Sequence, residues 1–164
     1  MKTLFLLRHA KSDWKDATLP DFERPLNGRG LKAAPLIGRF LRRRKIQPDL
    51  IFSSPAERAR QTTALVREAA RITADLRYDE RIYEASATRL LEIISQIEES
   101  ANVVLLVGHN PGLEELLAGL TGEPQNLPTA ALAKLNLEID KWNKVRERTG
   151  RLEWLVKPKE LVRS

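Results

Sequence analysis

The chain of 164 residues contains two histidines, and each of them follows a short apolar segment. His9 comes after Arg8 and residues 3–7, which are apolar or otherwise compatible with a strand, and His109 comes after residues 103–108. Short apolar runs bounded by polar residues are typical of strands that are buried on both faces of a parallel sheet. In open α/β sheets, ligands bind outside the carboxyl ends of such strands. The sequence therefore predicts that Arg8, His9 and His109 lie together at a ligand-binding edge.

The residue types at this edge suit a phosphoryl group. Another apolar segment, residues 48–53, leads into a helix whose first turn carries Arg58. Guanidinium groups and helix N-termini both bind phosphate oxygens. Histidine can act as a covalent nucleophile, and neighbouring positive charge favours the neutral imidazole that attack requires. These properties favour His9 as the nucleophile, with Ser53 or Ser54 as alternatives.

The same sequence carries no pattern that indicates a metal ion or a cofactor. It has no P-loop motif, no evident carboxylate cluster that would hold Mg²⁺, and no cysteine. We therefore expect phosphoryl chemistry without a metal ion, without a cofactor and without disulfides.

The elements that must position these residues alternate along the chain, which predicts a three-layer α/β/α fold. Strands are expected at residues 3–7, 48–53, 75–78, 102–107, 131–139 and 151–156, and helices at residues 28–45, 55–72, 87–98 and 111–120. The central sheet should be mostly parallel, with antiparallel pairing of the C-terminal strands. The length suits one domain over residues 1–164.

Local patterns also predict how the helices begin and which faces they bury. Residues 54–57 (Ser-Pro-Ala-Glu) have the order of a capping box, so Ser54 is expected to cap the second helix. Asn110, which precedes a proline, is expected to cap the fourth helix. In the first helix, Leu31 is expected on the buried face, and Pro35 is expected to cause a kink or a late start.

The composition is that of a globular protein with excess positive charge: 42% of the residues are hydrophobic, 30% are charged, and the net charge is +6. The apolar segments are too short for a signal peptide or a membrane span, so we expect a cytoplasmic protein with no membrane contact. The densest basic run, residues 42–45, falls at a predicted helix C-terminus, where cations are favourable anyway. Nucleic acid is therefore not the favoured partner.

Four segments resemble the motifs of the histidine phosphatase superfamily and follow their order. They are LRHA at residues 7–10, RPLNGRG at residues 24–30, SSPAERARQT at residues 53–62 and VGHNPG at residues 107–112. They are most similar to the small SixA-type branch of phosphohistidine phosphatases. The resemblance implies that His9 attacks phosphorus and becomes a transient phosphohistidine, while Arg8, Arg58 and His109 hold the phosphoryl oxygens. Water would then release inorganic phosphate. The family's Arg-His-Gly motif ends here in Ala10, a small residue that we expect to leave this chemistry intact.

The resemblance leaves the general acid open between two carboxyl groups. Glu80 follows the strand predicted at residues 75–78, which is the position that an acid occupies in larger relatives. Asp21, in the long polar loop of residues 11–27, is the alternative, and we rank it second. Arg24 in the same loop is expected to be a further phosphate or substrate contact.

The resemblance also bears on the substrate, because larger relatives carry insertions that form a lid. Here residues 82–86 leave little room for a lid subdomain. An open site suits a phosphorylated histidine on the surface of a signalling protein's phosphotransfer domain, and the positive net charge suits an acidic partner. One alternative is a small-molecule phosphomonoesterase that uses the same mechanism. The other is a non-catalytic module that binds phosphate or nucleic acid.

Overall fold

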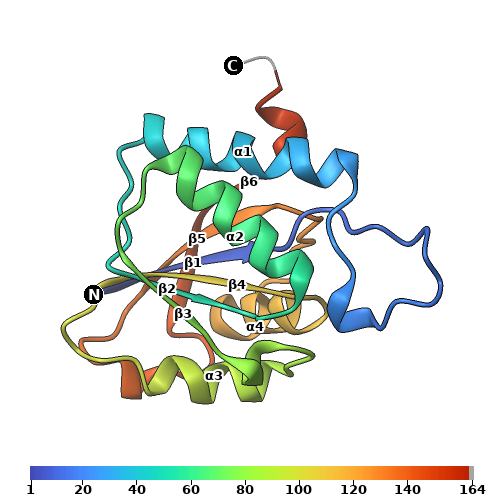
Figure 1. The fold of residues 1–164 in the computed structure, drawn as a ribbon. Coiled ribbons are helices and arrows are strands. Elements are labelled where there is room, and N and C mark those ends of the chain that lie inside the picture. The colour runs from blue at the N-terminus through green and yellow to red at the C-terminus, as the bar shows by residue number, and fades with distance from the viewer. Residues whose placement is uncertain (163–164) are drawn as a thin grey trace.

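The computed structural model describes residues 1–162, in which a six-stranded sheet is covered by helices on both faces (Figure 1). The strands are β1 (Lys2–Arg8), β2 (Leu50–Ser53), β3 (Asp75–Tyr78), β4 (Val103–Gly108), β5 (Leu132–Leu137) and β6 (Gly150–Val156). The helices are α1 (Gly28–Arg43), α2 (Glu57–Ala70), α3 (Ala87–Ser95) and α4 (Gly112–Thr121). Short 3-10 helices lie at Asp21–Glu23 (η1), Glu80–Ile82 (η2), Trp142–Lys144 (η3) and Pro158–Glu160 (η4).

The strand order in the sheet is β3-β2-β4-β1-β5-β6. β1 pairs with β4, and β2 pairs with both β3 and β4, in parallel. β5 pairs with β1 and β6 in antiparallel orientation. The predicted fold class, a largely parallel sheet with antiparallel pairing of the C-terminal strands, is confirmed. All the parallel strands end at the same edge of the sheet, near the loop that follows β1 (Figure 1).

Both faces of β1 pack against helices, which explains why its side chains are apolar on both faces. Leu4 and Leu6 belong to the core cluster that packs on α3 and α4, whereas Phe5 and Leu7 belong to the cluster that packs on α1 and α2. Helices α1 and α2 cover one face of the sheet, and α3 and α4 cover the other (Figure 1). The strand is therefore buried on both sides and holds the residues at its carboxyl end rigidly.

Three local predictions are wrong. Leu31 is 48% exposed, because α1 turns Gly30, Ala34 and Ile37 toward the core instead. Ser54 does not cap α2, whose N-cap position is taken by Ala56 without a side-chain hydrogen bond.

The N-cap position of α4 is likewise Pro111, because the Asn110 amide donates its hydrogen bond to the carbonyl of Leu127 (3.0 Å). Of the two effects expected of Pro35, a kink or a late start of α1, the late start does not occur, since this helix begins at Gly28 and continues past Pro35 to Arg43. Within residues 1–162, no helix combines the length and apolar character that crossing a bilayer requires.

Candidate active site

The strand register brings the two histidines together. Arg8 of β1 lies opposite Gly108 of β4, so His9 and His109 are the next residues beyond the ends of two adjacent strands. The His9 N–H donates to the carbonyl of Gly108 (3.1 Å), and the two imidazole rings lie 5.1 Å apart between centroids. Both side chains are more than nine-tenths buried. The predicted proximity of the strand-end histidines is therefore a direct result of parallel pairing.

The His9 ring is fixed in one tautomer. Its Nδ1 lies 2.7 Å from the carbonyl oxygen of Ala10, which can only accept, so Nδ1 carries the proton and Nε2 has a free lone pair. Burial is the main cause that lowers the pKa of His9 to about 4, and the charges of Arg58 and Arg8 lower it further. At neutral pH the imidazole is therefore uncharged, with Nε2 able to act as a nucleophile.

His109 is oriented by Ser54, the residue that follows β2. The Ser54 hydroxyl lies 2.7 Å from Nε2 of His109 and accepts a hydrogen bond from the Ala56 N–H (3.2 Å). Among the described residues this hydroxyl has no other acceptor within reach, so its proton belongs to the bond with Nε2, and Nδ1 of His109 carries the ring proton. That Nδ1 is buried and has no hydrogen-bond partner in residues 1–162.

Burial also lowers the pKa of His109, to about 3, and the nearby His9 and Arg58 lower it further. The ring is therefore neutral at physiological pH. A neutral ring with a buried, unpartnered Nδ1–H can donate a hydrogen bond to an oxygen of a ligand.

Arg58, from the first turn of α2, is held by the loop that follows β1. Its two terminal nitrogens donate to the backbone carbonyl of Asp21 (2.8 Å) and to Oδ2 of the Asp21 carboxylate (3.0 Å). The Tyr83 hydroxyl donates to the same Oδ2 (2.6 Å), and the Tyr83 ring packs edge-on against His109 at 5.5 Å. Arg58, Asp21, Tyr83 and His109 thus form one connected cluster.

The ionisation of this cluster follows from its hydrogen bonds. Burial pushes the pKa of Asp21 upward, but the hydrogen bonds from Tyr83 and Arg58 outweigh it, so the net shift is downward. Burial, followed by the hydrogen bond to Asp21, raises the pKa of Tyr83. Asp21 is therefore a carboxylate in the ligand-free site, and Tyr83 is a neutral donor.

The remaining predicted residues differ in how they relate to this cluster. Arg8 donates to the Leu127 carbonyl (3.3 Å), and its buried Nε has no partner among the described residues. Arg24 is buried, stacks on the ring of Trp14 at 4.1 Å and donates to the carbonyl of Asp16 (3.2 Å). These contacts are all within the loop, and neither of them joins Arg24 to the histidines.

Glu80 is exposed and lies in a surface hollow with Arg81 and Arg89, next to the cavity that contains Arg58 and His109 but outside it. That cavity has a volume of about 500 Å³ and is lined by Asp21, Arg58 and His109. Sequence reasoning missed two carboxylates in its wall, Glu84 and Glu115. Glu84 adopts a left-handed backbone conformation (φ 54°). No sequence signal marks this turn, because a positive φ at glutamate is uncommon.

Comparison with known proteins identifies relatives of this chain. The model of the histidine phosphatase superfamily (branch 1) matches residues 4–89, more than half of the chain. An uncharacterised protein of Mycobacterium tuberculosis strain H37Rv is 34% identical over 142 residues, which cover 80% of this chain and 87% of that protein.

Among solved structures, a protein of Agrobacterium tumefaciens that has been assigned as the phosphohistidine phosphatase SixA is 34% identical, with a TM-score of 0.82 over 96% of this chain and 98% of that one. A protein from Nakamurella with the same assignment is 26% identical, with a TM-score of 0.84 over 96% of each chain.

Proposed function

The chain belongs to the histidine phosphatase superfamily, and on that basis we propose that it hydrolyses a phosphoryl group through a covalent intermediate on His9, with phosphohistidine of a protein as the substrate. The observation that carries this proposal is the pair of strand-end histidines, one with a free Nε2 and the other with a buried, unpartnered Nδ1–H. A nucleophile and a donor side by side are what transfer of a phosphoryl group requires.

The first step is attack by Nε2 of His9 on phosphorus. A new N–P bond forms on His9, the bond between phosphorus and the substrate's imidazole nitrogen breaks, and that nitrogen leaves after taking up a proton. Arg8, Arg58 and the Nδ1–H of His109 hold the phosphoryl oxygens as charge redistributes. Removal of one such donor typically lowers kcat by about 10²–10³-fold.

The second step releases the product. Water attacks phosphorus of the phosphorylated His9, the N–P bond breaks, and inorganic phosphate leaves with His9 restored to its neutral form. The low pKa of His9, about 4, supports this cycle because the free enzyme then needs no deprotonation before the next attack at neutral pH.

For the general acid we favour Asp21 over Glu80, which reverses the ranking made from the sequence. Asp21 contacts both Arg58 and Tyr83, whereas Glu80 lies outside the cavity. A bound phosphoryl group competes with Asp21 for Arg58, which removes part of the stabilisation of the carboxylate and favours its protonation. We also propose that Arg24 contacts the part of the substrate that lies beyond the phosphoryl group.

The choice of a protein substrate rests on the relatives and on charge. Of the solved structures, the one at 34% identity bears the assignment of a phosphohistidine phosphatase. The net charge of +6 favours association with an acidic partner. A small phosphomonoester is the alternative substrate, with the same residues in the same roles.

The test compares a phosphohistidine-bearing protein with an aryl phosphate, using the wild type and His9→Ala. We expect the wild type to prefer the phosphoprotein, and His9→Ala to be inactive on both. Turnover of the aryl phosphate alone would leave the mechanism standing and reject the protein substrate. Hydrolysis of neither, or full activity of His9→Ala, would reject the proposed reaction.

The same assay separates the two candidate acids. Asp21→Asn should lower kcat on the aryl phosphate by about 100-fold or more, and it should do so more than on phosphohistidine, whose imidazole is the better leaving group. Glu80→Gln is the matched control and should change kcat little. The opposite ranking of the two variants would restore Glu80 as the acid.

A further inference from the structure

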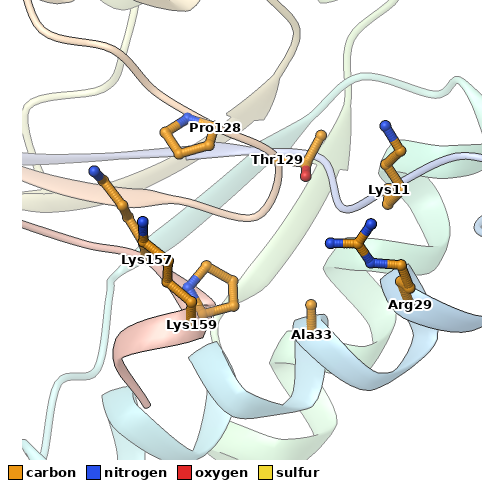
Figure 2. Close-up of a pocket in the computed structure, with 8 residues that line it drawn as sticks. Lys11, Arg29, Ala33, Pro128, Thr129, Lys157 and Lys159 are labelled. Carbon is orange, nitrogen blue, oxygen red and sulfur yellow. The ribbon is translucent and has the colours of Figure 1, made fainter. Parts of the chain in front are cut away.

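A second cavity lies on the α1 side of the sheet, away from the cavity that contains Arg58 and His109. It has a volume of about 250 Å³. In Figure 2, Lys157 and Lys159 lie on one side of it, Lys11 and Arg29 lie on the other, and Ala33 lies between them on α1. The lining residues of the two cavities do not overlap. Lys11 is nevertheless only two residues from His9, so both cavities open near the same end of β1.

The charge of this cavity has one sign. Four of its lining side chains are cationic, and none of its lining residues is acidic. Within residues 1–162, none of the four cationic groups forms an ion pair. Glu160, the acidic residue of η4, accepts a hydrogen bond from the Lys157 backbone N–H (2.8 Å). Four cations around one cavity with no carboxylate in its lining create a positive potential that attracts anions.

The cavity walls are held by backbone contacts, so its shape does not depend on flexible side chains alone. The carbonyl of Lys11 accepts from the Asn27 N–H (2.9 Å), and a Cβ on Gly30 would lie only 2.3 Å from this oxygen, so α1 packs directly on the segment that carries Lys11. On the opposite wall, the Ala130 N–H donates to the carbonyls of Arg8 and His9 (3.1 and 3.0 Å), which positions the neighbouring Thr129.

The floor is apolar. Ala33, Pro128 and Pro158 line the cavity together with the cationic groups. A binding site with a small apolar surface and a few convergent charges takes an anion that carries a short hydrophobic body, since each part of the ligand then meets a matching surface. Inorganic phosphate alone would leave the apolar part of the cavity unfilled.

We propose that this cavity is a second anion site, separate from the phosphoryl site at His9, and that it binds a small organic phosphate or phosphonate whose apolar body rests on Ala33 and the prolines. Lys157, Lys159, Lys11 and Arg29 provide the charge. The proposal concerns binding and holds whether or not phosphohistidine is the substrate at His9.

The test is a titration followed by the amide resonances of the ¹⁵N-labelled protein, with benzylphosphonate as the probe because its C–P bond resists hydrolysis. Inorganic phosphate supplies the charge without the ring, and benzyl alcohol supplies the ring without the charge. The amides of Ala33 and Lys159 report the cavity, and the amides of Gly108 and His109 report the phosphoryl site. We expect saturable shifts at Ala33 and Lys159 with benzylphosphonate, and weaker binding of both other probes.

The variant Lys157→Gln/Lys159→Gln should raise the Kd measured at Ala33 by about tenfold or more, the effect of roughly one lost charge-assisted contact. Lys141→Gln/Lys144→Gln removes two exposed lysines beside η3 and should leave this Kd unchanged. In the wild type, the affinity should fall as the salt concentration rises. Shifts confined to Gly108 and His109, equal binding of benzyl alcohol, or an unchanged Kd in the cavity variant would each overturn the proposal.

Discussion

Replacement of Ser54 by alanine tests whether this serine sets the tautomer of His109. The Ser54 hydroxyl lies 2.7 Å from Nε2, and both groups are buried. Without the hydroxyl, Nε2 has no partner, and the ring can place its proton on Nε2 instead of on Nδ1. An unsatisfied buried polar group costs about 1–3 kcal/mol. A loss of this size in the transition state corresponds to a fall in kcat of roughly 10- to 100-fold.

Ser53→Ala is the matched control, because this neighbouring serine is equally buried but bonds to Thr63 and to the Ser54 carbonyl rather than to a histidine. The assay is steady-state hydrolysis of an aryl phosphate, together with urea unfolding of each variant. We expect both variants to lose similar stability, and only Ser54→Ala to lose kcat.

Ser54→Thr keeps a hydroxyl at this position and should recover most of the activity. If Ser53→Ala and Ser54→Ala lower kcat equally, or if Ser54→Ala keeps the wild-type kcat, the serine does not position His109 and the reasoning fails.

Two further predictions concern pH and packing. Because burial holds the pKa of His9 at about 4 and that of His109 at about 3, the unfolded chain binds protons between about pH 6.5 and pH 4 that the folded chain does not. The free energy of unfolding should therefore fall as the pH falls through this window, by up to about 1.4 kcal/mol per pH unit for each histidine. Urea unfolding of His9→Gln/His109→Gln should show a weaker dependence of this free energy on pH. If the dependence is the same as in the wild type, the two histidines are not its cause. Gly38→Ala should lower the free energy of unfolding by about 1–3 kcal/mol, because its Cβ would lie 2.6 Å from a side chain of α2. Gly119→Ala, in the interior of α4 where an added Cβ would meet no atom outside the helix backbone within 4 Å, should raise the free energy of unfolding by about 0.5–1 kcal/mol. Equal effects of the two substitutions in thermal unfolding would refute the packing argument.

The sheet and the pair of histidines could be predicted because their signals are strong and local. A strand that is buried on both faces is apolar at successive positions, as residues 4–7 and 103–107 are, and parallel pairing then fixes where the following residues lie. Once β1 and β4 are known to be neighbours in the sheet, their pairing places His9 beside His109.

The role of Ser54 could not be predicted, because its local pattern favoured a different one. A serine before proline and three residues before glutamate has the order of a capping box, but the hydroxyl bonds to a residue 55 positions away. The positions of Asp21 and Glu84 in the cavity depend in the same way on loop geometry. Loops carry few periodic constraints, so tertiary contacts decide where their side chains point.

The position of β1 within the sheet has a consequence for how the protein becomes active as it is synthesised. Although β1 is made first, it lies between β4 and β5, so its backbone is fully paired only after residue 137 has been added. Contacts between residues this far apart in sequence form late, because the intervening chain must close first. The nascent chain therefore carries His9 long before its neighbours in the sheet have been made, and the surroundings of His9 are completed only when β4 and β5 have docked on either side of β1.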